Sequence, residues 1–263
     1  MSILLSELEN GVLTLTVNRP ERANAFNVEL IEALQKYLRS AEKDPAVRVV
    51  LLTGAGRTFG AGQDIEEMRA SGASGASLSY LGHLRKTYNP LVLQLRRIEK
   101  PVIAAINGAC AGASLGIALA CDLRLASANA SFVVGFNGIG LAPDSGVSLL
   151  LPALIGLGRA LEVTFTNVPV SAAQALDWGL VNHVCAPEEL PAESRSWALR
   201  LSAGPTGAYG LTKRAFNQAI LPDLEAVLEY EGQVQEVAAH LPEHQGAVAA
   251  FLEHRRPRFS AGL

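Results

Sequence analysis

The pattern of hydrophobic and polar positions predicts strands and helices that alternate along the first part of the chain. Residues 12–17 (VLTLTV) alternate apolar side chains with threonine, which is typical of a β-strand. Residues 49–52 are short and uniformly apolar, as expected of a strand buried on both faces. Between them, Ile31 and Leu34 fall on one face of a predicted helix that Asn27 can cap.

The pattern changes near residue 157 and is almost entirely helical from there on. Before that point we expect a helix over 78–97, strands over 102–106, 123–126 and 131–134, and a helix that begins near Asp144. After it we expect helices over 172–176, 190–201, 206–219, 224–237 and 246–254. This order favours an α/β architecture with a core over residues 1–200 and a C-terminal helical subdomain over residues 201–263.

One long stretch carries no charge. Between Lys100 and Asp122 the chain reads as a strand (PVIAAI), a glycine-rich turn (NGACAG) and the start of a helix (ASLGIALAC). The first N–H groups of such a helix have no partner within it and can bind a developing negative charge. The run is also long enough to span a membrane, but Asn107, Ser114 and the glycines argue against that.

Composition narrows the possible functions. The chain is 49% hydrophobic and only 18% charged, which predicts extra burial in an oligomer, and its net charge of −3 gives no footprint for nucleic acid. Its three cysteines lack CxxC spacing, its five histidines form no metal pattern, and its N-terminus lacks a signal peptide. We therefore expect a cytoplasmic protein without metal, membrane or nucleic-acid partners.

Two glycine-rich turns share one design. Residues 59–65 (FGAGQDI) and 107–113 (NGACAGA) each follow a predicted strand and lead toward a helix. Small residues let a ligand approach the backbone, and two converging N–H groups can hold a thioester oxygen as it becomes an enolate. Each glycine cluster alone is weak evidence and is more typical of a structural turn.

Together with their flanking residues, the two turns give a more specific indication of a protein family than either turn alone. Residues 17–27 (VNRPERANAFN), 59–65 and 107–112 resemble, in order, the motifs of the crotonase (enoyl-CoA hydratase/isomerase) superfamily, and residues 176–182 and 251–259 are similar to its C-terminal segments. The resemblance implies a crotonase-like spiral of ββα units, a helical trimerisation region and an acyl-CoA substrate. It also implies a homotrimer or a hexamer built as a dimer of trimers. No separate cofactor is expected, because coenzyme A is part of the substrate.

The resemblance also assigns roles to individual residues. The oxyanion donors would be the backbone N–H groups of Gln63 and Ala113. Further residues would form the wall that takes the adenine and pantetheine of coenzyme A: Ala23, Ala61, Asp64 and Ile65.

The C-terminal segment would close over the nucleotide from an adjacent subunit. Phe251 and its basic neighbours resemble the family's residues there. His254 stands where the family usually has lysine, so the phosphate contact would pass to Arg255 or weaken.

The acid–base positions depart from the hydratase pattern. Where the family's hydratases carry two catalytic glutamates, this chain has Gly116 and Phe136, and neither can transfer a proton. One carboxylate remains, Asp144, in a Pro-Asp-Ser-Gly element that resembles the ring-1,2-epoxyphenylacetyl-CoA isomerase branch. Apolar neighbours such as Leu141 would raise the pKa of Asp144 and make it a better base. Asp144 is also suited to cap a helix, and the two roles are compatible.

The leading interpretation is an acyl-CoA isomerase that moves a proton with Asp144. The alternatives are an enoyl-CoA hydratase of fatty-acid or aromatic acid degradation, a CoA-binding or RNA-binding scaffold without turnover, and a hydrolase or dehalogenase with Asp144 as nucleophile. Residues 66–90 are expected to line the acyl pocket, and the small residues 72–77 predict a mobile loop.

Overall fold

Two β-sheets form the centre of the molecule. The computed structural model describes residues 2–68, 79–253 and 255–259. Within these residues the larger sheet has six strands in the order β1-β2-β3-β5-β7-β10, antiparallel at β1 and parallel elsewhere. They are β1 (Leu4–Glu9), β2 (Val12–Val17), β3 (Val49–Gly54), β5 (Val102–Ile106), β7 (Leu123–Ser127) and β10 (His183–Cys185).

The smaller sheet continues the long strands. Its order is β4-β6-β8-β9, with bounds Thr58–Gly60, Ala109–Ala111, Ser131–Val133 and Val170–Ser171. Each of β3, β5 and β7 is followed by a short strand of this sheet, and β5 and β6 lead directly into helix α5 (Ala113–Ala120). The predicted α/β spiral of ββα units is therefore confirmed.

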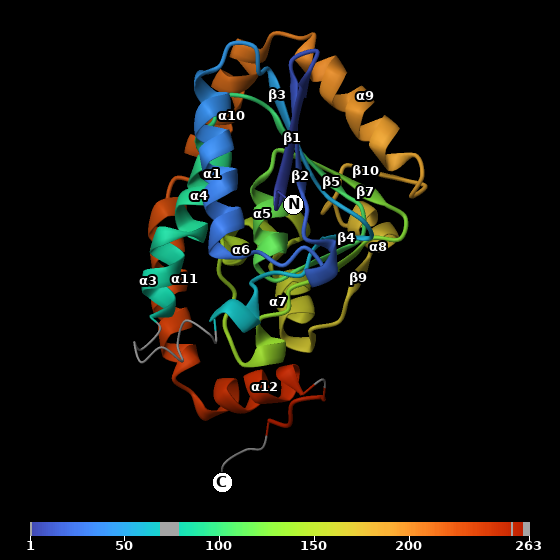
Figure 1. The fold of residues 1–263 in the computed structure, drawn as a ribbon. Helices are drawn as coiled ribbons and strands as arrows, with labels where there is room; N and C mark the ends of the chain where they lie inside the picture. The colour runs from blue at the N-terminus through green and yellow to red at the C-terminus, as the bar shows by residue number, and fades with distance from the viewer. Residues whose placement is uncertain (1, 69–78, 254, 260–263) are drawn as a thin grey trace.

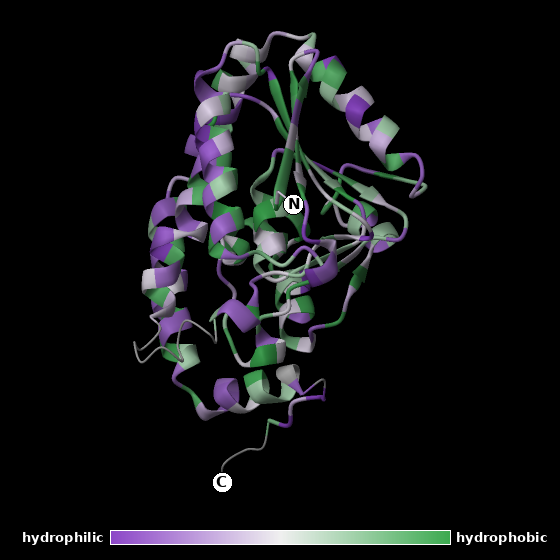
Figure 2. Ribbon diagram, viewed as in Figure 1, coloured by the Kyte–Doolittle hydropathy of each residue, from purple (hydrophilic) through white to green (hydrophobic). Residues whose placement is uncertain are grey.

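Helices cover both faces of the larger sheet (Figure 1). Helix α9 (Leu190–Ser202) packs on β3, β5 and β7, where Val49, Ile103 and Leu125 meet Leu190. Alternate residues of the same strands, such as Val50 and Ala104, turn to the main core on the opposite side. Burial on both faces explains why the central strands are uniformly apolar, and Figure 2 shows them as a hydrophobic centre.

The main core is covered by helices from several parts of the chain. They are α1 (Val28–Lys43), α3 (Tyr80–Lys86), α4 (Tyr88–Arg97), α6 (Val147–Ile155), α7 (Leu157–Thr166) and α8 (Ala172–Asp177), with 3₁₀ turns η1 (Pro20–Arg22) and η2 (Asn137–Ile139). Asn27 caps α1 as predicted, because its side chain accepts a hydrogen bond from the N–H of Leu30. Helix α1 extends to Lys43.

The prediction of one helix over 78–97 is wrong. The segment forms α3 and α4, which meet at Thr87 with φ −116° and ψ −81°. Pro90 explains the break, because its ring clashes with the carbonyl group four residues earlier and it has no N–H to donate. The predicted mobile loop at 72–77 lies outside the described residues.

The C-terminal helices pack onto the core. They are α10 (Thr206–Ile220), α11 (Leu224–Ala239) and α12 (Pro242–Leu252). Helix α11 contacts α3, α4 and α6, and α12 contacts η2. The division at residue 200 stays a prediction. Among the described residues, every helix is too short or too polar to cross a membrane.

A buried ion cluster attaches α10 to the core. Lys213 Nζ donates to Asp122 Oδ2 at 2.8 Å and to the carbonyl oxygen of Leu95 at 2.7 Å. Asp122 also accepts from Arg96 at 3.0 Å and from the N–H of Val102 at 2.8 Å. Burial lowers the pKa of Lys213, and the neighbouring Asp122 opposes that shift. The cluster is the main polar connection between α10 and the sheet.

We expect Asp122→Asn to lower the free energy of unfolding by about 3 kcal/mol, because it leaves Lys213 buried without its counter-charge. Urea unfolding followed by circular dichroism measures the change. Glu99→Gln is the matched control, since it breaks the exposed Arg214–Glu99 pair one residue along α10 and should cost less than about 1 kcal/mol. Equal costs for both variants would contradict this account.

Candidate active site

A cavity of about 1100 Å³ lies between the two glycine-rich turns, η2 and the helices α3, α4, α11 and α12. Seven of the residues predicted for the site line it: Ala23, Ala61, Gln63, Asp64, Ile65, Ala113 and Asp144. Within the described residues, no group of three or more His, Cys, Asp or Glu side chains is placed to hold a metal ion.

The first glycine-rich turn is held by the segment that precedes α1. The N–H of Ala61 donates to the carbonyl oxygen of Ala23, and the N–H of Phe26 to that of Gly62. Arg19 forms an ion pair with Asp64 at 2.9 Å, so the Asp64 carboxylate stabilises this turn even though it borders the cavity. These bonds explain why residues 17–27 and 59–65 form one structural unit.

The second turn packs directly against the first. Gly112 has φ +55°, and Ala113 is the first residue of α5. A Cβ atom at Gly62, where φ is +91°, would lie 3.0 Å from the Ala111 carbonyl oxygen and 3.4 Å from the Ala113 nitrogen. Glycine is therefore required at 62 both for its backbone conformation and for this close approach.

The buried hydroxyl of Ser114 joins the two turns. It lies within hydrogen-bond distance of the carbonyl oxygens of Gly60 and Ala111. Among the described residues, the backbone N–H groups of Gln63 and Ala113 donate to no protein acceptor, and both residues line the cavity. Within the part of the chain that the structure describes, the two adjacent turns thus each leave one backbone donor without a protein acceptor; their role as oxyanion donors stays a prediction.

Asp144 is buried at the cavity wall, with 7% of its surface exposed. Its Oδ1 accepts a hydrogen bond from Ser145 Oγ at 2.7 Å, and its Oδ2 accepts one from Gln235 Nε2 at 2.7 Å. Burial raises the pKa of Asp144 to about 6, although both hydrogen bonds oppose the rise. This carboxyl group is therefore suited to exchange a proton near neutral pH.

The alternative that Asp144 is a helix cap is wrong. Helix α6 begins at Val147, three residues later than Asp144, and its N-cap residue Gly146 makes no side-chain cap. Glu231 of α11 takes that role instead. Its two carboxylate oxygens accept from the N–H of Gly146 at 2.8 Å and from the N–H of Ser148 at 2.9 Å. Burial raises the pKa of Glu231 to about 7.

The structure explains why position 116 carries no acid. A Cβ atom at Gly116 would lie 2.6 Å from Cβ of Ser145 and 2.7 Å from its carbonyl oxygen. The turn that carries Asp144 therefore occupies the space that a side chain at 116 would need. Phe136, at the other glutamate position, is a buried part of the cavity wall.

Side chains from α3 and α4 hold the side chain of Gln63. Its Oε1 accepts from the Tyr88 hydroxyl at 2.8 Å and lies 3.0 Å from His83 Nε2. Burial lowers the pKa of His83, which favours the neutral ring. A neutral ring must donate from Nε2 to this amide oxygen, since that oxygen cannot donate.

A second polar pair lies where α12 meets the cavity. His244 Nδ1 is 2.7 Å from the carbonyl oxygen of Ile139, and its Nε2 is 2.7 Å from the Tyr80 hydroxyl. In the neutral imidazole Nδ1 carries the proton, so Tyr80 donates to Nε2.

The sequence interpretation assigned no role in the site to Glu231, Gln235 or His244. It expected residues 66–90 to line the acyl pocket, and His83 and Tyr88 of that segment do line the cavity. Glu231 and Gln235 lie four residues apart on α11 and are both buried. Their burial would have pointed to a role in the site, but the sequence alone does not show that they are buried.

The predicted nucleotide contacts at the C-terminus stay predictions. Phe251 belongs to α12, and His254 lies outside the described residues. Arg255 is exposed and paired with Glu253, and it is not among the residues that line the cavity.

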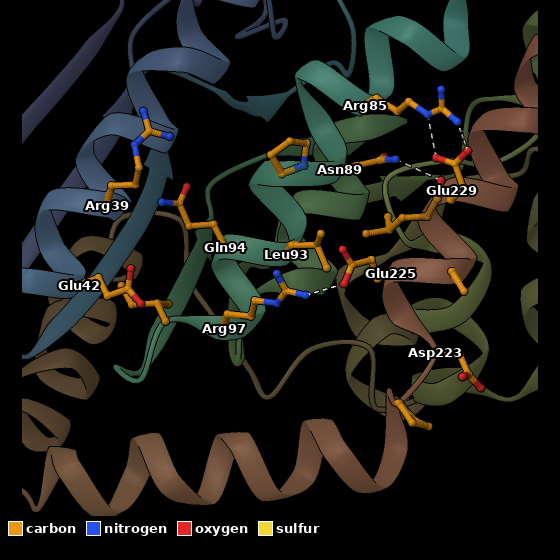
Figure 3. A pocket seen from close by; sticks show the side chains of 15 residues that line it. Arg39, Glu42, Arg85, Asn89, Leu93, Gln94, Arg97, Asp223, Glu225 and Glu229 are labelled. Atoms are coloured by element: carbon orange, nitrogen blue, oxygen red, sulfur yellow. Dashed lines mark hydrogen bonds and ion pairs between the residues drawn. The ribbon is translucent and has the colours of Figure 1, made fainter.

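A second crevice of about 990 Å³ lies on the outside, between α1, α4 and α11 (Figure 3). Two ion pairs lie in it, Arg85 with Glu229 and Arg97 with Glu225. Arg39, Glu42 and Asp223 also line it. It contains none of the predicted site residues.

Comparison with known proteins places this geometry in a family. The profile of the enoyl-CoA hydratase/isomerase family matches residues 7–262. The chain is 40% identical to the 1,2-epoxyphenylacetyl-CoA isomerase of Escherichia coli K12 over 99% of both chains, and 34% identical to a trans-2-decenoyl-[acyl-carrier-protein] isomerase of Streptococcus mutans over 98% of this chain and 97% of the relative.

A solved structure agrees with the sequence relatives. The crystal structure of an enoyl-CoA hydratase from Mycobacterium avium subsp. paratuberculosis superposes with a TM-score of 0.88 and is 36% identical, over 98% of this chain and 99% of the other. By sequence and by fold, this chain belongs to the enoyl-CoA hydratase/isomerase family and is an enzyme of that family.

Proposed function

We propose that this enzyme isomerises an acyl-CoA thioester by moving one proton between two carbons of the acyl group. The observation that carries the proposal is the buried carboxyl group of Asp144, which lines the same cavity as Gln63 and Ala113. Among the described residues, the backbone N–H groups of Gln63 and Ala113 donate to no protein acceptor. The two relatives named above as isomerases are consistent with this proposal.

The reaction requires one base and one oxyanion site. Asp144 in its ionised form removes a proton from carbon, so that a C–H bond breaks and an O–H bond forms on the carboxyl group. The electron pair moves to the thioester oxygen, where the N–H groups of Gln63 and Ala113 stabilise the enolate. Asp144 then returns the proton to a different carbon. A single carboxyl group suffices, because no water is added.

Hydration would need a second acid–base group. Gly116 is packed against Ser145, and Phe136 is apolar, so neither glutamate position can supply one. This is why we favour isomerisation over hydration.

Coenzyme A enters the proposal as part of the substrate. Ala23, Ala61 and Ile65 border the cavity next to the first turn, and we assign the adenine and pantetheine to this wall. The small side chains leave the backbone accessible to an extended ligand.

The assembly that we propose is a homotrimer, alone or as a dimer of trimers. Helix α7 exposes Leu157, Leu161 and Phe165, the last with 69% of its surface exposed. These three side chains border a hollow of about 600 Å³ between α6, α7 and α12, and Leu241 and Phe259 border it too. An apolar face of this kind is typical of a subunit contact. The three cysteines, all described and all free, fit the cytoplasm that we propose as the location.

The reaction class is tested by incubating the enzyme with straight-chain and ring-derived CoA thioesters, followed by mass spectrometry and ultraviolet absorbance. Isomerisation changes absorbance and leaves the mass unchanged. A product heavier by one water would assign the chain to the hydratases instead.

We expect Asp144→Asn to lower kcat by about 10³-fold, because the amide cannot accept the proton. Circular dichroism checks that the variant is folded. Asp177→Asn, an exposed carboxylate on α8, is the matched control and should keep full activity. Normal turnover by Asp144→Asn would end the proposal.

The rate should depend on the ionised form of Asp144. Because its pKa is raised to about 6, kcat/KM should rise with pH up to about 6 and level off above it. Below that pH the rate should fall about tenfold per unit, as the base becomes protonated. A pH–rate profile measures this, and a flat profile between about pH 5 and 8 would contradict it.

Phe165→Asp should shift the enzyme toward monomers, since it places a charge in the apolar face of α7. Sedimentation velocity measures the mass. Leu5→Asp changes an exposed leucine on the edge strand β1 and should leave the assembly intact. The α7 face is not the subunit contact if both variants sediment like the unsubstituted enzyme.

A further inference from the structure

Gln235 lies in the cavity wall and has no role in the proposed reaction as described so far. It is 1% exposed, lies on α11 and borders the cavity. Its Nε2 donates to Asp144 Oδ2 at 2.7 Å, while its Oε1 is buried and, among the described residues, has no hydrogen-bond partner.

An orphaned buried acceptor is costly, about 1–3 kcal/mol, so a native site that keeps one calls for an explanation. The ionised carboxylate of Asp144 can only accept, so the amide must present its NH₂ group and leave Oε1 idle. A protonated Asp144 carries an O–H donor. Rotation of the amide about its last torsion then brings Oε1 to that donor.

We propose that Gln235 is a positioning residue that serves both protonation states of Asp144, by donating from Nε2 to the ionised carboxylate and accepting at Oε1 from the protonated acid. This inference rests on the proposed function. In the proton transfer itself a C–H bond breaks and an O–H bond forms on Asp144, and Gln235 neither gains nor loses a proton. The amide of Gln235 keeps the Asp144 carboxyl group oriented from the formation of the enolate until Asp144 returns the proton to carbon.

The neighbours of Asp144 support this assignment. Ser145 Oγ holds Oδ1, which leaves Oδ2 to Gln235. Among the described residues, the titratable groups whose pKa values are raised by the charge of Asp144 include Glu231 on α11, Tyr80 on α3 and Tyr88 on α4. Burial raises the pKa of each of these three groups. The tyrosines are neutral near neutral pH, and Glu231 is engaged with the start of α6. Gln235 is therefore the residue placed to donate to Oδ2 of Asp144 when it is ionised and to accept from it when it is protonated.

Infrared difference spectroscopy of the whole enzyme between about pH 8 and 5 tests the acceptor role without relying on activity, since that range spans the protonation of a buried carboxyl group. The C=O band of protonated Asp144 is identified by its loss in Asp144→Asn. In Gln235→Met, which keeps the volume and removes both polar atoms, this band should move to higher wavenumber, because the acid has lost its acceptor. An unmoved band would overturn the proposal.

The pH–rate profile tests the donor role. Gln235→Met removes a hydrogen bond that lowers the pKa of Asp144, so the acidic limb should move to higher pH and the plateau kcat should fall about tenfold. Gln235→Glu places a second carboxyl group beside Asp144, and the pair should titrate with separated apparent pKa values. The acidic limb of the pH–rate profile should then lie at least about one pH unit above that of the unsubstituted enzyme. Gln233→Met, exposed on the same helix, is the matched control and should leave the profile and the infrared band unchanged.

A merely structural role would lower stability in Gln235→Met without moving either the limb or the band, and that result would also overturn the inference. If Asp144→Asn is fully active, the proposed function fails. Even then, the infrared result decides whether Gln235 accepts a hydrogen bond from protonated Asp144.

Discussion

The close packing of Gly62 against Ala113 is the contact on which the site depends. It joins turns from two different ββα units, and among the described residues the N–H groups of Gln63 and Ala113 have no protein acceptor. The first helical N–H groups of α5 cannot be satisfied within the helix, and the Ser114 hydroxyl ties the two turns together. A larger residue at 62 would separate the turns and strain the backbone at once.

The carboxyl group of Asp144, which lines the same cavity as these donors, is held from the C-terminal part of the chain. Gln235 and Glu231 lie one helical turn apart on α11, so both reach the same segment of the core. Gln235 binds the Asp144 carboxylate, and Glu231 binds the backbone at the start of α6. The C-terminal helices therefore complete the cavity within one subunit, in addition to the assembly role that the family resemblance implied.

The same segment explains why position 116 carries no acid. Ser145 fills the space beside Gly116, so the turn that presents Asp144 also excludes a side chain at position 116. The carboxyl group of Asp144 is itself buried, and that burial raises its pKa toward neutrality.

Local patterns were enough to predict much of the molecule. The apolar runs predicted the central strands and Asn27 predicted the start of α1, because each depends on residues close together in the chain. The assignment of Gln63 and Ala113 as oxyanion donors came from the family resemblance and stays a prediction. Two features depended on contacts between distant segments and could be read only from the tertiary structure. Asp144 lines the cavity instead of capping α6, and Glu231 caps α6 from 85 residues away in the sequence. The break at Thr87 was missed even though Pro90, a local signal, explains it. Burial and partners decide the chemistry of a carboxyl group, and a linear sequence does not state either one.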